Sequence, residues 1–247
     1  MLLKLICCDA FARMAYTYAA SSEHTIDLEL VPMLAHIEPE KLHRDLQERI
    51  DRCCESDRSY DAILLGYGLC GNAALGLSAS IPLIIPRMHD CCTMFCGSRE
   101  CFIDAFGKHP STRWRSAGYY ERCDMVNQED GEPFNYKTCT EYLEYVEKYG
   151  EEEAEELWIM MHPEIETDEA IYITIDGYEQ KDCCSLFRRD VEMENKNLKV
   201  IQGSTALFER LVNGPWDDRD FLTVKPGEKI GAVYDLQEVM RALPLEG

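Results

Sequence analysis

The chain has 247 residues, 46% of them hydrophobic, and a formal net charge of −21, with 46 acidic against 25 basic residues. This length and composition are typical of a globular protein with a sizeable core. The acidic excess excludes nucleic acid from the expected partners, because its phosphates need a face rich in lysine and arginine. It disfavours anionic membrane surfaces for the same reason.

Apolar runs and helical patterns alternate along the chain. The predicted strands are 2–8, 25–33, 61–68, 82–86, 170–176, 198–203 and 221–225, and the predicted helices are 10–20, 38–54, 91–106, 138–161, 177–195 and 204–213. Strands that alternate with helices are typical of βαβ units, which build a mostly parallel sheet. The sequence therefore predicts an α/β fold, doubly wound, with helices on both faces of a mostly parallel sheet, in a single domain over 1–247.

Two places interrupt this alternation. The segment 107–136 is polar, aromatic and rich in glycine and proline, so we expect a long inserted loop that serves as a lid or a binding loop. Within the predicted helix 138–161, Gly150 marks an expected break, because glycine is a poor helix former.

The 13 cysteines are expected to be free thiols. The short apolar stretch at the N-terminus opens directly into a strand and does not resemble a secretory signal. No run approaches the ~18 apolar residues of a membrane span. We therefore expect a cytoplasmic protein without a membrane segment, whose cysteines are metal ligands, buried thiols or redox groups rather than disulfides.

Three of these cysteines follow predicted strands at the point where each strand ends. Cys8 ends LKLICC, Cys70 follows AILLGYGL, and Cys91 follows IPLIIPRMHD. Because the carboxyl ends of parallel strands converge on one crevice, which is where ligands bind, we expect the three thiols to share a site. Such a set of thiols indicates a metal or cluster site better than a disulfide framework.

The segment IPRMHDCC concentrates the most chemistry. Side chains two apart on an extended segment face the same way, so His89 is expected beside Cys91. With Cys8 and Cys70, they make three sulfurs and one nitrogen, which is a known zinc set. We expect Arg87, on the same face, to bind an anionic substrate group or neutralise thiolates, and Asp90 to orient a ligand; both are candidate catalytic residues.

The segment GYGLCGN, 66–72, follows the third strand. Its glycine spacing matches neither the dinucleotide fingerprint nor the P-loop, so a nucleotide site is disfavoured. The sequence predicts instead a sharp turn that presents Cys70, with Gly68, Gly71 and Asn72 as cofactor-binding positions. A helix that begins at Gly71 and Asn72 is expected to lower the pKa of the Cys70 thiol.

Weaker candidates surround this set. His36 and Cys123 are placed where they could reach the same crevice, and Asp176 ends the fifth predicted strand. Cys96 and Cys101 are expected to point away from the site, along the helix that follows Cys91.

The motifs LGYGLCGN, IPRMHDC, CGSRE and ERLVNGPWDDRDFLTVKPGEKI resemble a domain-of-unknown-function family of anaerobic bacteria and archaea, over roughly Leu2 to Ile230. The resemblance implies a setting in corrinoid-dependent methyltransferase systems, with a corrinoid protein or a methyltransferase as partner. The family's motif positions fall on Cys8, His36, Gly66, Tyr67, Gly68, Cys70, Gly71, Asn72, Arg87, His89, Asp90 and Cys91. The chain departs from the family pattern at Tyr119, Cys92 and Cys96.

Three functions remain open at this point. The first is a zinc-dependent enzyme or accessory protein of corrinoid-linked methyl transfer, whose zinc keeps one position open for a small-molecule substrate. The second is an iron–sulfur protein in which Cys8, Cys70 and Cys91 hold a four-iron cluster with one open iron. The third is a non-enzymatic partner or activator of a corrinoid protein, which would use Trp114, Tyr119 and Tyr120 of the 107–136 segment.

Overall fold

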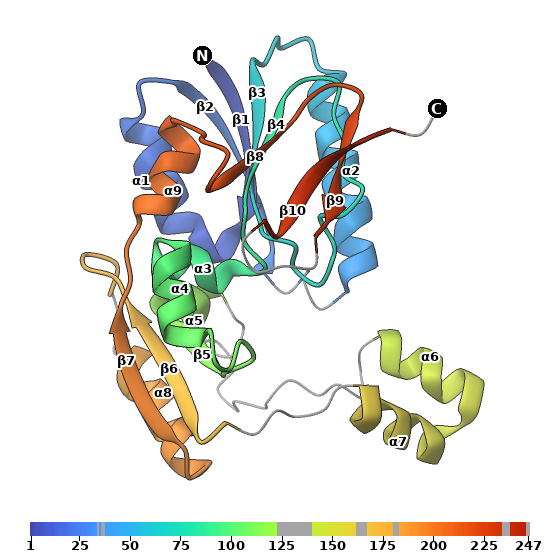
Figure 1. The fold of residues 1–247 in the computed structure, drawn as a ribbon, viewed down its shortest axis with the longest axis vertical. Coiled ribbons are helices and arrows are strands. Elements are labelled where there is room, and N and C mark those ends of the chain that lie inside the picture. The colour runs from blue at the N-terminus through green and yellow to red at the C-terminus, as the bar shows by residue number, and fades with distance from the viewer. Residues whose placement is uncertain are drawn as a thin grey trace.

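The computed structural model describes residues 1–33, 35, 38–122, 140–161, 167–179, 183–233 and 238–245. Its main sheet has five strands in the order β2-β1-β3-β4-β8 (Figure 1). They are β2 (Thr25–Val31), β1 (Leu2–Cys8), β3 (Ala62–Gly66), β4 (Leu83–Pro86) and β8 (Phe221–Val224). The first four are parallel and β8 is antiparallel to β4. The predicted α/β class with a mostly parallel sheet is confirmed.

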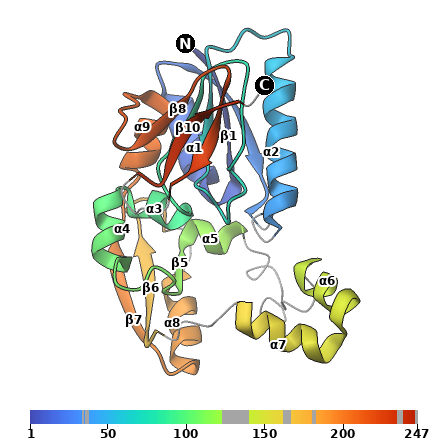
Figure 2. The same ribbon diagram turned by 45° about the vertical axis from the view of Figure 1, so that its right-hand side comes forward.

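The main sheet is covered on both faces, as its buried strands require. Every residue of β3 and β4 is buried. The helix α2 (Pro39–Cys54) lies on one face and buries Leu42, Leu46 and Ile50, which recur at the four-residue spacing of one helix face. The helices α1 (Ala12–Ser21) and α9 (Ala206–Asn213) lie on the opposite face (Figures 1 and 2).

A second sheet contains the other parallel strands. It has the order β5-β6-β7, with β5 (Trp114–Ser116), β6 (Glu169–Thr174) and β7 (Asn197–Gln202). The helix α8 (Cys183–Met193) packs on it, burying Phe187 against Tyr172 and Tyr120. The predicted strands 170–176 and 198–203 therefore exist but belong to a separate sheet. An apolar run indicates that a strand is buried, not which strands it pairs with.

The segment that leads from the main sheet to the second sheet differs from the prediction in two places. The expected helix 91–106 is two helices, α3 (Cys91–Cys96) and α4 (Arg99–Phe106), because Gly97 adopts a left-handed φ of 80° and ends α3. The first part of the expected loop 107–136 contains β5 and the helix α5 (Ala117–Arg122). Residues 123–136 lie outside the described residues.

Two further features complete the chain. A hairpin of β9 (Glu228–Ala232) and β10 (Met240–Pro244), which the sequence analysis did not predict, packs beside β8. The helices α6 (Thr140–Tyr149) and α7 (Glu151–Met161) pack on each other through Tyr142 and Trp158 and lie apart from both sheets (Figures 1 and 2). Gly150, with a φ of 91°, separates them at the expected break.

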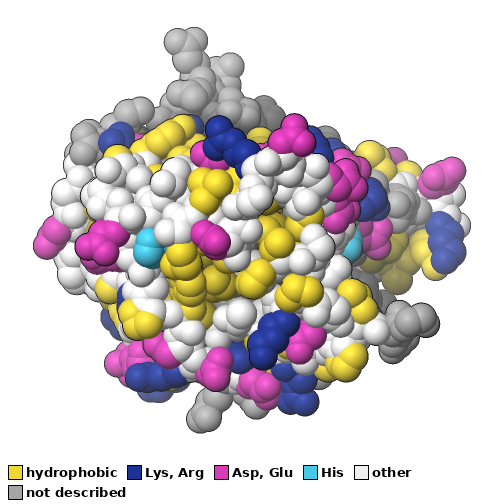
Figure 3. Space-filling model, turned by 90° about the horizontal axis from the view of Figure 1, so that it is seen from above, with side chains coloured by type: hydrophobic (Ala, Val, Ile, Leu, Met, Phe, Trp, Pro, Cys, Tyr) yellow, Lys and Arg dark blue, Asp and Glu magenta, His cyan; other side chains and the backbone are white. Residues whose placement is uncertain are grey.

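The surface charge is mixed where the amino ends of the main strands lie. Figure 3 shows acidic and basic side chains interspersed with apolar ones on this end of the molecule. None of the helices that the structure describes combines the length and the apolar character that a membrane-spanning segment requires.

Candidate functional site

Three thiols from three adjacent strands line one cavity. Cys8 is the last residue of β1, and Cys70 and Cys91 lie a few residues beyond the ends of β3 and β4. All three line a cavity of about 310 Å³. The cavity lies at the carboxyl ends of parallel strands, which is where an open α/β sheet binds its ligands.

Burial in the cavity wall disfavours the charged, thiolate form of the three cysteines. Burial raises the pKa of the Cys8 thiol and of the Cys70 thiol to about 12. Burial also raises the pKa of Cys91 above its usual range, and the neighbouring Asp90, Cys70 and Cys8 add to this shift. The thiols alone are therefore protonated at neutral pH, so a soft metal that binds them must displace their protons.

The expectation that a helix lowers the pKa of Cys70 is wrong. Residues 70–76 form turns, so no helix begins at Gly71 and Asn72, and burial raises the pKa of the Cys70 thiol instead. Cys70, Gly71 and Asn72 instead adopt left-handed φ angles of 46°, 66° and 72°. A left-handed conformation costs an L-residue such as Cys70 about 1–2 kcal/mol, and strain of this kind clusters at functional sites. Asn72, which the sequence predicts to bind a cofactor with Gly68 and Gly71, does not line the thiol cavity. It lines a neighbouring hollow with Pro39.

Close backbone contact holds the loops of Cys70 and Cys91 together. The Cys70 N–H donates to the His89 carbonyl at 2.9 Å. A Cβ on Gly68 would lie 2.6 Å from the Met88 carbonyl oxygen, so only glycine fits here without displacing a loop. Gly68 and Gly71 both line the cavity. Their role in the geometry is to let the two thiol-bearing segments approach each other.

His89 and Asp90 differ in how they stand to the cavity. The His89 side chain is not among those that line the cavity, and its Nε2 is buried without a hydrogen-bond partner in the described residues. Asp90 does line the cavity, and its Oδ1 accepts from the Cys92 N–H at 2.9 Å, which caps α3. Asp90 thereby fixes the start of the helix whose first residue is Cys91.

Arg87 does not face the thiols, contrary to the expectation. Its Nε donates to the carbonyl oxygens of Asp218 and Phe221 at 2.8 and 3.3 Å. Its Nη1 donates to the carbonyl oxygen of Glu238 at 3.0 Å and to that of Met240. Arg87 thus ties the end of β4 to β8 and β10. From the sequence, residues 87, 89 and 91 are expected on one face of an extended segment. That expectation is wrong because the chain bends after β4 and is not extended from 87 to 91.

The opposite wall of the cavity comes from the second sheet. Trp114 and Arg115 of β5 and Tyr119 of α5 line it. The Arg115 guanidinium lies 4.6 Å from the centre of the Tyr119 ring, and its Nη1 donates to the Trp114 carbonyl at 2.8 Å. Arg115 could not be singled out from the sequence, because it lies in the segment predicted as a loop and no pattern marks it.

Tyr67 combines a place in the cavity lining with a buried polar atom. The residue is 3% exposed and lines the cavity directly after β3. Its hydroxyl is buried and has no hydrogen-bond partner among the described residues. Buried hydroxyls in folded proteins are nearly always hydrogen-bonded, so this one is available to a bound group.

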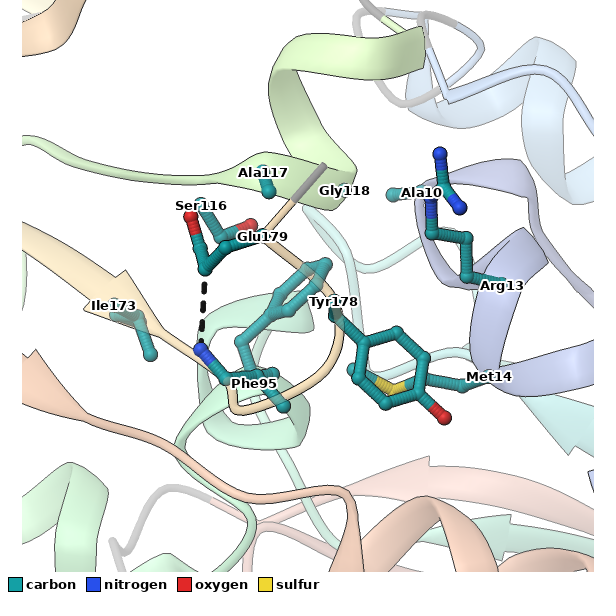
Figure 4. A pocket seen from close by; sticks show the side chains of 11 residues that line it. Ala10, Arg13, Met14, Phe95, Ser116, Ala117, Gly118, Ile173, Tyr178 and Glu179 are labelled. Atoms are coloured by element: carbon teal, nitrogen blue, oxygen red, sulfur yellow. Dashed lines mark hydrogen bonds between the residues drawn. The ribbon is translucent and has the colours of Figure 1, made fainter. Parts of the chain in front are cut away.

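Gly118 fixes the second wall to the first. It lies in α5, and a Cβ there would meet the Ala10 carbonyl oxygen at 2.6 Å and the Phe95 ring at 3.1 Å. Ala10 belongs to the short 3-10 helix after β1 (Asp9–Phe11), and Phe95 to α3. Figure 4 shows these residues around a gap of about 10 Å³, room for about one water. The helix α5 therefore packs closely on the segment after β1 and on α3, and it does so through a glycine.

We expect Gly118→Ala to lower the free energy of unfolding by about 1–3 kcal/mol, the usual cost of overpacking a tight contact. The added methyl group must displace α5 from Ala10, and so should also change the fluorescence of Trp114 in the cavity wall. Urea unfolding and Trp fluorescence measure both effects. An unchanged midpoint would show that the two walls are not held together here.

The remaining candidates lie elsewhere. The neighbouring thiols of Cys92 and Cys101 lower the pKa of the Cys96 thiol, and none of the three residues lines the cavity, as expected for Cys96 and Cys101. Asp176 is exposed beyond β6. His36 and Cys123 lie outside the described residues.

Comparison with known proteins gives one finding. A family profile described as a protein of unknown function, DUF1638, matches residues 30–212. The match includes Cys70, Cys91 and Arg115 and begins after Cys8. No curated protein matches the chain, and no solved structure does. Since the profile covers more than half of the sequence, the chain belongs to the DUF1638 family of proteins of unknown function.

Proposed function

We propose that this protein is a metal-thiolate protein in which Cys8, Cys70 and Cys91 hold an iron–sulfur cluster with one open iron for a small-molecule substrate. The observation that carries the proposal is a cavity of about 310 Å³ that is lined by three cysteines, each at or shortly after the end of a different strand. Thiolates are the usual ligands of four-iron clusters, and three of them leave one iron without a protein ligand.

The described residues contain no compact set of ligands for one ion, which favours a cluster over a single zinc ion. Tetrahedral zinc bonds of about 2.3 Å bring thiolate sulfurs to within about 4 Å of one another. Among the residues that the structure describes, no three His, Cys, Asp or Glu side chains lie close enough together to hold one ion. A four-iron cluster spans several ångströms, so it suits thiols that surround a cavity rather than meet at a point.

Each wall of the cavity has a task in this proposal. When bound, the cluster supplies an iron that polarises a substrate oxygen or exchanges an electron. Phe11, Met33 and Trp114 exclude water from it, which strengthens electrostatic interactions inside the cavity. Gly68 and the helix cap formed by Asp90 keep the segments that carry Cys70 and Cys91 in a fixed position relative to each other.

Zinc is the second candidate, because one observation favours it. His89 Nε2 is buried and without a partner in the described residues, two positions before Cys91. A rotation of this side chain toward the thiols would complete the three-sulfur, one-nitrogen set that zinc prefers.

His89→Ala separates the two metals. If a cluster is held by three cysteines, we expect the variant to keep its iron, because His89 is not a ligand. If the metal is zinc, the variant should lose most of it, because one of four ligands is gone. Metal analysis of wild type and variant, purified without oxygen, measures this, with His109→Ala as the matched control outside the cavity.

The experiment that tests the proposal itself is metal and sulfide analysis of the wild-type protein after anaerobic purification and reconstitution. We expect a brown protein with about four irons and acid-labile sulfide per chain. A colourless protein with one zinc would establish the second candidate. A protein that binds neither metal would contradict both, and leave the non-enzymatic function.

The setting of the function is part of the proposal. The resemblance of the GYGLCGN and IPRMHDC segments supports a cytoplasmic role in corrinoid-linked methyl transfer, with a corrinoid protein or a methyltransferase as partner. A corrinoid is too large for a cavity of about 310 Å³ that also holds a cluster, so such a partner would dock at the surface. Co-purification with a corrinoid protein from the native source tests the partner.

A further inference from the structure

We infer that the thiol cavity binds a small carboxylate, with Arg115 as the anion-binding residue and Tyr67 as a hydrogen-bond donor. The inference deepens the proposed function by naming the class of its substrate. It rests on the proposed function only for the metal that would contact the end of the ligand away from the carboxylate. The binding itself depends on two residues that hold no metal.

Arg115 carries a charge that the described part of the protein does not pair. It lines the cavity, and its described contacts are the Trp114 carbonyl and the Tyr119 ring. Arg113, two residues earlier on the way into β5, is different: it forms ion pairs with Glu194 and Asp190. Among the described acidic side chains, none forms an ion pair with Arg115. In a chain of net charge −21, an arginine beside a cavity that has no ion-pair partner among the described residues is suited to an anion from outside.

The position of this guanidinium is fixed before a ligand arrives. The hydrogen bond to the Trp114 carbonyl and the stacking on Tyr119 hold it at the wall, and Trp114 and Tyr119 contact each other with ring centres 5.4 Å apart. A planar guanidinium in a fixed orientation can hold a carboxylate through two parallel hydrogen bonds. Preorganisation of this kind lowers the entropy cost of binding.

Tyr67 points to the same class of ligand from the other wall. Tyr67 lines the cavity, and its hydroxyl is buried and has no partner among the described residues. A hydroxyl in that position donates readily to a carboxylate oxygen. Arg115 belongs to the second sheet and Tyr67 to the loop after β3, so a ligand held by both would bridge the two sheets.

The rest of the lining limits the size and character of the ligand. Phe11, Met33, Trp114 and Tyr119 offer carbon surface, which favours a short hydrocarbon chain next to the carboxylate. The volume of about 310 Å³ is at the small end for ligand sites and must be shared with the metal group. A carboxylate of a few carbons fits these limits, and a nucleotide does not.

Propionate and its neutral analogue propionamide are the probes for the test, with calorimetric titration of the full chain. We expect saturable, one-to-one binding of propionate, and binding of propionamide at least tenfold weaker, because the analogue lacks the charge. Arg115→Gln should weaken propionate binding by about tenfold to a hundredfold, and Tyr67→Phe by about tenfold. Arg115→Lys should give an intermediate loss, because lysine keeps the charge but not the two parallel hydrogen bonds.

Arg122→Gln is the matched control, since Arg122 is an exposed arginine of α5 that does not line the cavity. It should bind propionate as the wild type does. Urea unfolding of each variant shows whether it is folded, and Arg115→Gln is expected to unfold at the wild-type midpoint. Equal binding of the two probes, or wild-type affinity in Arg115→Gln, would overturn the inference.

The same titration distinguishes this inference from the proposed function. Protein that holds its metal but binds propionate only weakly and without saturation would contradict the inference and leave the metal site standing. Protein that takes up no metal but binds propionate through Arg115 would contradict the metal site, while the carboxylate site would stand.

Discussion

Cys70→Ala and Cys91→Ala are each expected to lose most of the bound iron after anaerobic purification. Two thiolates remain in each variant, and they cannot replace the ligands that a cluster needs at three of its irons. Neither change should unfold the protein: both residues are only half-buried as a whole, and alanine keeps the Cβ that Cys70 already carries at its left-handed φ of 46°. Iron and sulfide analysis, with the visible absorption spectrum, measures the loss.

Two buried cysteines outside the cavity serve as matched controls. Cys53 lies in α2 and Cys183 in α8, 6% and 1% exposed, and neither lines the cavity. Their alanine variants should keep full iron and lose only the small stability of a buried thiol. Loss of iron from Cys183→Ala to the same extent as from Cys70→Ala would mean that iron content reports folding rather than ligation.

Arg87→Met is expected to lower the free energy of unfolding by about 3 kcal/mol, with little effect on metal content. The substitution removes hydrogen bonds from a charged donor to four backbone carbonyls of the segments around β8 and β10. It leaves those carbonyls without their donor in a partly buried place, and hydrogen bonds to charged groups are worth about 1.5–3 kcal/mol each. Urea unfolding measures the change.

Arg122→Met is the control for this variant, because Arg122 is exposed and its loss should leave the unfolding midpoint unchanged. From the sequence, Arg87 is expected to bind a substrate anion. If Arg87→Met unfolds like the wild type but no longer binds propionate, that expectation is right and the structural role assigned to Arg87 is wrong.

The part of the site that could be predicted from the sequence is the part that strands determine. Cys8, Cys70 and Cys91 each follow a continuous apolar run, and such runs are buried strands of a parallel sheet in this fold. Strand ends converge at one edge whatever the details of packing. The three thiols could therefore be placed in one cavity without knowing how the connecting loops run.

The part that could not be predicted depends on contacts between distant segments. Arg115 reaches the cavity because β5 pairs with β6 in a second sheet, and Gly118 then seats α5 against the end of β1. Arg87 turns away because β8 and the hairpin that follows offer it carbonyls. Period-two patterns and strand ends carry no information about either pairing.

The Mössbauer spectrum of anaerobically reconstituted, iron-57-labelled wild-type protein tests the central claim most directly, because it distinguishes an iron that lacks a cysteine ligand from those that have one. The account predicts a four-iron cluster whose spectrum divides roughly three to one, with the minor component shifting when propionate is added. A spectrum of equivalent irons that propionate leaves unchanged, or the absence of bound iron, would contradict the account.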